Sequence, residues 1–246
     1  MENAGDLWRQ VEGVLPGVEE IYFAGGEPLV MEEHWRILRF LVERKMFDVQ
    51  LNYTTNFSSL IYKGEDVLAL WRSFERVRVL ASLDGMGRRG EYLRKGSRWR
   101  QVLENRARMI RESPHVEFRV FPTASVMNAW HLPDLHAEWI DRGFIGRDQF
   151  QINLLFSPEE FCVQALPPRF KRLIEEKYAA YLSRLPALPN EPEDARGFKN
   201  LLNFMRARDL SALMPRFRDM TRRLDAIREE RFEEIFQELA ELMREA

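Results

Sequence analysis

The sequence predicts an α/β fold built on a parallel sheet, followed by a helical extension at the C-terminus. Three observations lead to this prediction. Apolar strand patterns alternate with amphipathic helix patterns over residues 1–160. Glycine, asparagine or aspartate follows several strands, at the end of a parallel sheet where ligands bind. Residues 161–246 continue with helical patterns and no further strand, so we expect a domain boundary between residues 160 and 161.

Each element follows from the spacing of its apolar residues and from the turn residues around it. Expected helices occupy residues 7–15, 32–44, 66–74, 99–112, 132–142, 168–184, 197–206 and 216–244. Expected strands occupy residues 20–23, 49–53, 77–83, 116–121 and 150–155. A helix between successive strands is a crossover connection, which makes the sheet parallel.

Composition excludes several classes of protein. The chain has 246 residues, with 37 basic against 39 acidic residues, and one cysteine. The balanced charge argues against a bulk electrostatic nucleic-acid binder. One cysteine allows neither an intrachain disulfide nor an all-cysteine metal site. No apolar run reaches the length of a membrane span and no signal peptide is recognisable, so we expect a cytoplasmic protein without membrane partners.

Several strands alternate polar and apolar residues, which is unusual for parallel strands covered on both faces. We predict that the polar residues share a wet face that lines a substrate cavity, while the apolar residues between them pack against helices. An open, polar-lined partial barrel explains the pattern, and a sheet with one solvent face is the alternative. The expected cavity residues are Asn52, Arg78, Glu117, Arg119, Gln151 and Asn153.

Candidate ligand-binding residues recur at the carboxyl ends of the strands. Gly25 and Gly26 lack side chains, so a ligand can approach the backbone there, and Pro28 restricts the chain just after them. Asp84 follows a later strand and can accept hydrogen bonds from ribose hydroxyls, while Arg94 can pair with a carboxylate. Tight turns use the same residue types, so one such residue alone does not indicate a ligand site. The prediction of a ligand site rests on the recurrence of these residues at successive strand ends.

These motifs resemble those of the radical SAM superfamily, and within it the SPASM/twitch-type proteins. The matching stretches lie at residues 21–29, 54–56, 82–85 and 91–96, in the family's order and spacing, within residues 7–158. The resemblance implies a partial (β/α) barrel of radical SAM type, truncated at the N-terminus, that binds S-adenosylmethionine (SAM). The SAM-site residues that it implies are Gly25, Gly26, Glu27, Pro28, Asn56, Ser82, Asp84, Arg94 and Asn128.

The family's chemistry requires a [4Fe–4S] cluster, which cleaves SAM reductively and starts hydrogen abstraction from substrate. Its Cys-x-x-x-Cys-x-x-Cys loop is absent here, and Cys162 lies beyond the last expected strand. Since cluster ligation needs thiolates, we expect no metal site in this chain.

Three interpretations follow. In the first, the chain is part of an enzyme for a polar substrate such as a peptide, and it is truncated and inactive alone. In the second, it is a cluster-less module that binds SAM or a partner. In the third, it is a barrel with a phosphate or sugar ligand.

Other polar residues are given structural roles. His34, His115, His131 and His136 lack metal-ligand spacing, and we interpret them as surface or capping residues. Ser82 has no evident histidine and acid partners for a hydrolase triad. Residues 86–97 are expected to form a loop that can close over a ligand.

Overall fold

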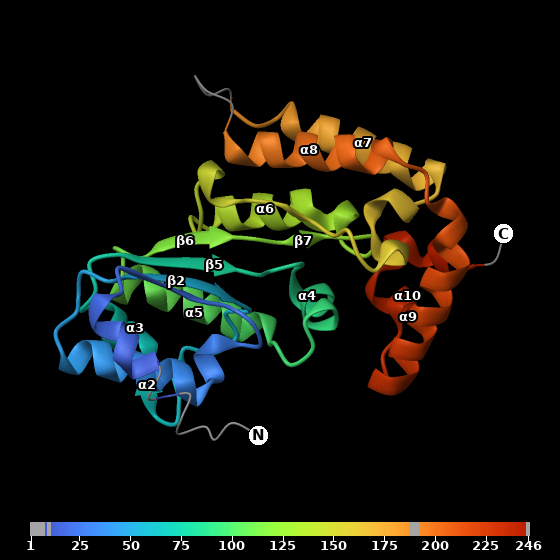
Figure 1. Ribbon diagram of the computed structural model, residues 1–246. Coiled ribbons are helices and arrows are strands. Elements are labelled where there is room, and N and C mark those ends of the chain that lie inside the picture. The colour runs from blue at the N-terminus through green and yellow to red at the C-terminus, as the bar shows by residue number, and fades with distance from the viewer. Residues whose placement is uncertain (1–7, 9–10, 187–191, 245–246) are drawn as a thin grey trace. The chain divides into compact units, whose positions relative to one another are not determined.

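The computed structural model describes residues 8, 11–186 and 192–244 (Figure 1). The chain divides into two compact units. The first comprises Met1–Thr55, Ser59–Leu80 and Arg108–Phe118, and the second comprises Asn56–Ser58, Ala81–Ala107 and Arg119–Ala246. The expected boundary between residues 160 and 161 lies inside the second unit and stays a prediction. The expected helix at residues 7–15 lies partly outside the described residues.

The described elements form a mixed α/β fold. The strands are β1 (Glu20–Phe23), β2 (Gln50–Thr55), β3 (Ile61–Tyr62), β4 (Glu65–Asp66), β5 (Val77–Ala81), β6 (Glu117–Val120), β7 (Thr123–Ala124) and β8 (Asn153–Leu154). The helices are α2 (Glu32–Glu43), α3 (Val67–Trp71), α4 (Gly87–Leu93), α5 (Trp99–Glu112), α6 (Leu132–Asp141), α7 (Pro168–Leu182), α8 (Glu193–Ala207), α9 (Met214–Arg228) and α10 (Phe232–Ile235), with 3-10 segments that include η2 (Pro28–Val30) and η8 (Gln237–Met243).

The main sheet has the strand order β1-β2-β5-β6, with β1 at one edge as predicted. β1 and β2 are parallel, with Glu20 opposite Gln50 and Phe23 opposite Tyr53. Neighbours in this sheet follow one another along the chain, without the reversal of order found in doubly wound folds. In the second unit, Val120 pairs with Phe150 and β7 pairs with β8, both in parallel.

Helices cover the apolar face of this sheet in the first unit. The rings of Phe23 and Tyr53 lie 4.8 and 5.4 Å from the imidazole of His34 in α2. The ring of Tyr53 also lies 5.0 Å from Trp71 in α3. These aromatic side chains are nearly or fully buried. Tyr53 of β2 therefore packs against helices, as predicted, and Phe23 of β1 does the same.

The last expected helix, at residues 216–244, is wrong as one continuous element. α9 ends at Arg228 because Glu229 adopts a left-handed conformation, with φ at 54°. The Oδ2 atom of Asp225 accepts a hydrogen bond from the backbone N–H of Phe232 at 2.9 Å, where α10 begins. A polar side chain bonding to the backbone thus ends one helix and starts the next, without the glycine or proline that marks such a break in sequence.

Helix α4 forms within the segment expected to be a loop. It begins at Gly87, and Gly90 lies inside it against the preceding turn. A Cβ atom on Gly90 would collide with the backbone carbonyl of Gly85. The two glycines lower the helix propensity of this stretch, which is why the sequence pattern indicates a loop.

Three of the four histidines are buried, so their interpretation as surface residues is wrong, although His131 occupies the N-cap position of α6 without a side-chain capping bond. His34, His131 and His136 are 3%, 5% and 0% exposed. Each lies close to an aromatic ring, Tyr53, Phe236 and Phe150 respectively. Burial lowers the pKa of His34 to about 3 and that of His136 to about 4.

The free energy of unfolding is therefore expected to fall as the pH falls from about 6.5 toward 4. Both His34 and His136 stay neutral in the folded state, while the unfolded chain takes up their protons below about pH 6.5. Each contributes on the order of 1 kcal/mol per pH unit in this window. Urea denaturation of the wild type and of His34→Gln across this range measures the effect. The variant should give a flatter profile, and equal slopes would contradict the expectation.

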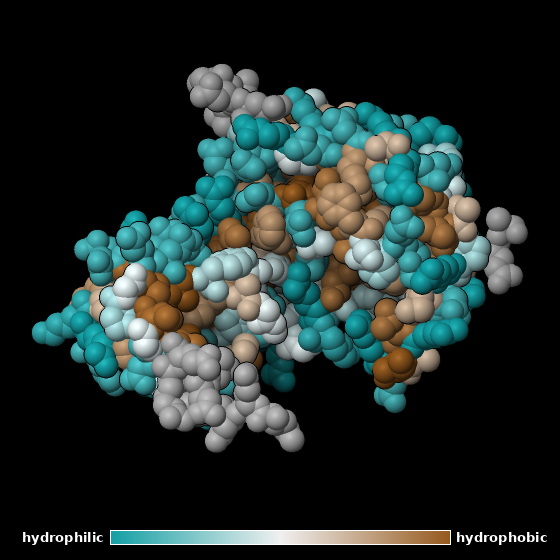
Figure 2. Space-filling view, in the orientation of Figure 1, coloured by the Kyte–Doolittle hydropathy of each residue, from teal (hydrophilic) through white to brown (hydrophobic). Residues whose placement is uncertain are grey.

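Hydrophilic residues cover most of the surface visible in Figure 2, and hydrophobic residues gather in separate patches. Exposed large hydrophobic side chains of the first unit include Val14, Tyr22, Val30 and Met31, at 41% exposure or more. None of the helices in the described ranges is long and apolar enough to cross a membrane.

Candidate functional site

The expected SAM-site residues fall into both units. Gly25, Gly26, Glu27 and Pro28 belong to the first unit, and Asn56, Ser82, Asp84, Arg94 and Asn128 belong to the second. Gly25 and Gly26 follow the carboxyl end of β1, and Ser82 and Asp84 follow that of β5, whereas Arg94 is the C-cap residue of α4.

The turn after β1 exposes backbone. Gly25 and Gly26 have φ values of +82° and +56°, in the left-handed region that favours glycine. A Cβ atom on Gly25 would meet no atom within 4 Å, so open space adjoins this backbone. The Glu27 carboxylate accepts hydrogen bonds from the backbone N–H of Leu29 at 3.4 Å and from the hydroxyl of Thr55. Glu27 thus connects the turn after β1 to the end of β2.

In the second unit, Asp84 connects the strand-end segments. Its Oδ1 atom accepts from the backbone N–H of Thr123 at 2.7 Å, and its Oδ2 atom accepts from Nε of Arg94 at 2.8 Å. Asn128 donates from Nδ2 to the carbonyls of Asp84 and Thr123, at 3.0 and 2.9 Å. Its Oδ1 atom accepts from the backbone N–H of Ser125 at 2.7 Å. Asn128 therefore braces these segments.

Arg94 and Ser82 have polar groups that remain available to a ligand. The Arg94 side chain is 31% exposed, and its Nη1 and Nη2 groups make no hydrogen bond within the described residues. The Ser82 hydroxyl likewise has no hydrogen-bond partner in the described ranges, and Ser82 is 7% exposed.

The Oδ1 atom of Asn56 accepts from the backbone N–H of Ser58 at 2.9 Å, which shapes the turn after β2.

A polar face runs across the sheet of the first unit. Gln50 donates from Nε2 to Oδ1 of Asn52 at 3.2 Å, and Asn52 donates from Nδ2 to Oε1 of Glu20 at 2.5 Å. Further along, Nε of Arg78 donates to Oε2 of Glu117 at 2.8 Å. These residues alternate with the buried residues Leu51, Val79 and Phe118. Asn52 is itself only 6% exposed, so its predicted place on a wet face is wrong, because its side chain is covered where it bonds to Gln50 and Glu20. The pattern is the alternation read from the sequence, and the role of this face as a substrate cavity stays a prediction.

The other three expected cavity residues lie in the second unit. Arg119 donates from Nη1 to the backbone carbonyl of Asp148 at 3.1 Å. Asn153 donates from Nδ2 to the hydroxyl of Thr123 at 3.3 Å. The backbone N–H of Gln151 donates to the carbonyl of Val120 at 2.9 Å. The bond from Gln151 accompanies the parallel bridge between Val120 and Phe150.

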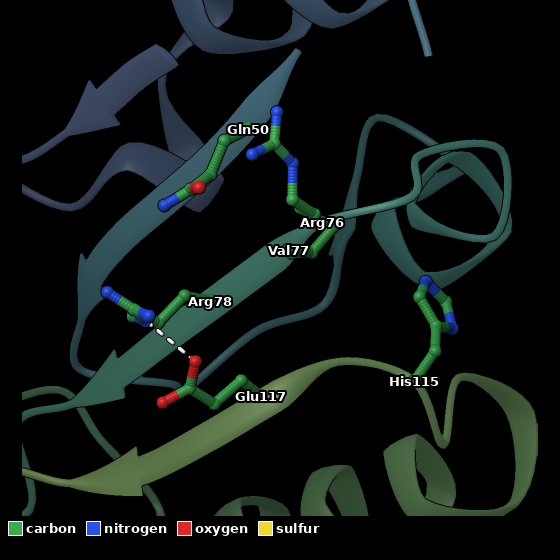
Figure 3. A pocket seen from close by; sticks show the side chains of 6 residues that line it. All are labelled: Gln50, Arg76, Val77, Arg78, His115 and Glu117. Carbon is green, nitrogen blue, oxygen red and sulfur yellow. Dashed lines mark hydrogen bonds and ion pairs between the residues drawn. The ribbon is translucent and has the colours of Figure 1, made fainter. Parts of the chain in front are cut away.

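A pocket of about 210 Å³ lies at the amino-terminal ends of β2, β5 and β6 (Figure 3). Figure 3 shows these three strands running in the same direction past the pocket. Sequence reasoning selected Arg78 and Glu117 and missed Arg76, which lies two residues before Arg78 and so faces the same side of the strand. The residues that line the pocket are Gln50, Arg76, Val77, Arg78, His115 and Glu117.

The described residues contain no group of three His, Cys, Asp or Glu side chains that could hold a metal ion. Cys162 is buried, and its thiol donates to the backbone carbonyl of Leu155 at 2.8 Å. Burial raises the pKa of this thiol. A single protonated thiol does not fit the ligand set of an iron–sulfur cluster, which needs several thiolates.

Comparison with known proteins finds similarity to solved structures. No family model matches the chain, and no curated protein matches it. The structure of native anSMEcpe with bound AdoMet and Cp18Cys peptide is similar, with 17% sequence identity and a TM-score of 0.46. The similarity covers 74% of this chain and 53% of that one, so this chain spans about half the length of the similar structure. A similarity of this size identifies neither a family nor a ligand.

Proposed function

We propose that this chain is the SAM-binding part of a radical SAM-type enzyme that acts on a polar substrate such as a peptide. The observation that supports the proposal most is the open turn at Gly25 and Gly26, with positive φ values, directly after an edge strand. An exposed backbone of this kind offers N–H and C=O groups to a ligand at close range. The amino group of SAM has three donors that such carbonyl groups can accept.

Within the second unit, Arg94 offers the positive charge that a carboxylate ligand needs. The carboxylate of SAM would pair with Nη1 and Nη2 of Arg94, whose Nε is already held by Asp84. Fixing one edge of a guanidinium in this way orients the other edge for bidentate binding. The Ser82 hydroxyl would add a further hydrogen bond. Asp84 retains unused lone pairs on its carboxylate oxygens and could also accept from the ribose hydroxyls.

The residues of this chain do not fit the [4Fe–4S] cluster that reductive SAM cleavage requires. Cys162 is the single cysteine, and its buried thiol bonds to a carbonyl. If the chain is part of a radical SAM-type enzyme, the cluster ligands must therefore come from outside this chain. The single cysteine favours a second candidate function, that of a cluster-less module that binds SAM or a partner. An in-frame Cys-x-x-x-Cys-x-x-Cys motif in the coding sequence upstream of Met1 would separate the two.

SAM binding to the purified chain is expected to be weak and to depend on Arg94. The Arg94→Ala variant loses charge-assisted hydrogen bonds worth about 1.5–3 kcal/mol, which corresponds to roughly tenfold or more in affinity. Asp84→Ala should act in the same direction, because it releases the Arg94 side chain from its fixed position. Isothermal titration calorimetry of the wild type and both variants measures the effect.

Arg100→Ala is the matched control for this titration. Its side chain is 92% exposed on α5 and pairs with Glu104, one helical turn away. It should leave SAM affinity unchanged. No saturable SAM binding by the wild type, or binding that neither Arg94→Ala nor Asp84→Ala weakens, would refute the proposed site.

A further inference from the structure

The pocket in Figure 3 lies at the end of the sheet opposite to the Gly25–Gly26 turn. Gln50, Val77 and Glu117 are the first residues of their strands. Thr55, at the carboxyl end of β2, lies five residues after Gln50, which corresponds to about 16 Å of extended chain. The proposed SAM contacts at Gly25–Glu27 therefore do not use this pocket, and its chemistry can be considered separately.

Two arginine side chains provide the positive charge of the pocket. Arg76 donates from Nη2 to the backbone carbonyl of Asp48 at 2.9 Å and makes no ion pair within the described residues. This bond holds the guanidinium and leaves the N–H groups of Nε and Nη1, which lie on different edges, for single hydrogen bonds to a ligand. Arg78 uses Nε for Glu117, which leaves its two Nη groups. With one carboxylate against two guanidinium groups, the pocket has a formal charge of +1.

These groups converge on one face of the sheet. Arg76 and Arg78 are two residues apart, so their side chains leave the strand on the same side. In Figure 3 the guanidinium of Arg76 extends toward the side chain of Gln50, and Arg78 lies further along the same strand. At the opposite side of the pocket, Nε2 of His115 lies 3.1 Å from the backbone carbonyl of Trp71. Because a carbonyl only accepts, this nitrogen carries the proton, and the bond fixes the ring.

The charge and size of the pocket select the ligand. Guanidinium groups bind planar carboxylates through paired hydrogen bonds. A formal charge of +1 matches a monoanion, whereas the Glu117 carboxylate would repel the second negative charge of a phosphate dianion. A volume of about 210 Å³ suits a small organic acid. We propose that this pocket binds a small monocarboxylate, held by the remaining N–H groups of Arg76 and Arg78.

An NMR titration of the whole ¹⁵N-labelled chain with sodium butyrate, against sodium chloride at equal ionic strength, tests this proposal. Saturable shifts are expected for the Gln50 side-chain amide and for the backbone amides of residues 76–78. Arg76→Gln and Arg78→Gln should each weaken butyrate binding roughly tenfold. Glu117→Gln should strengthen it, because it removes the carboxylate that competes for Arg78. Arg100→Gln, an exposed arginine outside the pocket, should have no effect.

Several results would overturn the proposal. One is the absence of saturable shifts with butyrate. Another is unchanged or weaker binding by Glu117→Gln, which would mean that Arg78 is not a ligand-binding group. A third is equal weakening by Arg100→Gln, which would indicate nonspecific attraction. Tighter binding of inorganic phosphate than of butyrate would assign the pocket to phosphate instead. SAM is absent from this titration, so its outcome is independent of the proposed SAM site.

Discussion

Replacing Asp194 by alanine is expected to lower the free energy of unfolding by about 3–5 kcal/mol, because it leaves a poorly solvated cation without its partner. Asp194 is fully buried in the first turn of α8. Its two carboxylate oxygens accept hydrogen bonds from Nε and Nη2 of Arg147, at 2.7 and 3.2 Å. The Arg147 side chain is only 15% exposed. Nε2 of His136, on α6, lies 3.4 Å from the same carboxylate.

Urea denaturation of Asp194→Ala measures this loss, with Glu138→Ala as the control. Glu138 pairs with Arg142 one helical turn away on the exposed side of α6, at 2.8 Å. Exposed pairs of this kind contribute about 0–1 kcal/mol. The expectation is wrong if Asp194→Ala lowers the free energy of unfolding no more than Glu138→Ala does. Water would then solvate the buried charges in a way that the contacts do not indicate.

Tyr92→Ala is expected to cost about 3–5 kcal/mol, the usual range for removing a large buried aromatic side chain. Tyr92 lies in α4 and is 1% exposed. Its ring centroid lies 5.4 Å from that of Phe236 and 6.3 Å from that of Phe232, both in the C-terminal helical segments. Its hydroxyl donates to Oδ1 of Asp225 in α9 at 2.7 Å. Burial, with Asp225 beside it, raises the pKa of Tyr92, so it stays a hydrogen-bond donor.

Tyr92→Phe separates the packing of the ring from the hydrogen bond. It keeps the contacts with Phe232 and Phe236 and removes only the bond to the charged Asp225, for a loss of about 1.5–3 kcal/mol. Amide hydrogen exchange in α4 should accelerate more in Tyr92→Ala than in Tyr92→Phe. Equal stability of the two variants would show that the ring contacts contribute nothing beyond the hydroxyl.

The parts of the fold that follow from local spacing were predicted correctly from the sequence. β1 occupies the expected residues 20–23 and lies at an edge of its sheet. The polar residues Arg78 in β5 and Glu117 in β6 alternate with buried ones, because a strand turns successive side chains to opposite faces. α5 occupies the expected residues 99–112, since its amphipathic pattern is long enough to specify a helix.

The features that depend on distant residues were not predictable in this way. α4 contains two glycines and is held by the ion pair of Arg89 with Glu238, at 2.7 Å, about 150 residues apart. The burial of His136 depends on aromatic residues from other elements, among them Phe198. In the candidate site, Gly25 could be identified because its chemistry is local, whereas the hydrogen bond from Nε of Arg94 to Asp84 requires the turn of α4 between them.

The polar face at the start of β5 and β6 allows sequence change without loss of the fold. Arg78 and Glu117 are 48% and 36% exposed, and an ion pair this accessible adds little to the free energy of unfolding. Their neighbours Val79 and Phe118 are fully buried and carry the packing. Substitutions at alternate positions of the same strands therefore have separate consequences. Relatives of this protein could diverge in what this face binds while keeping an unchanged core.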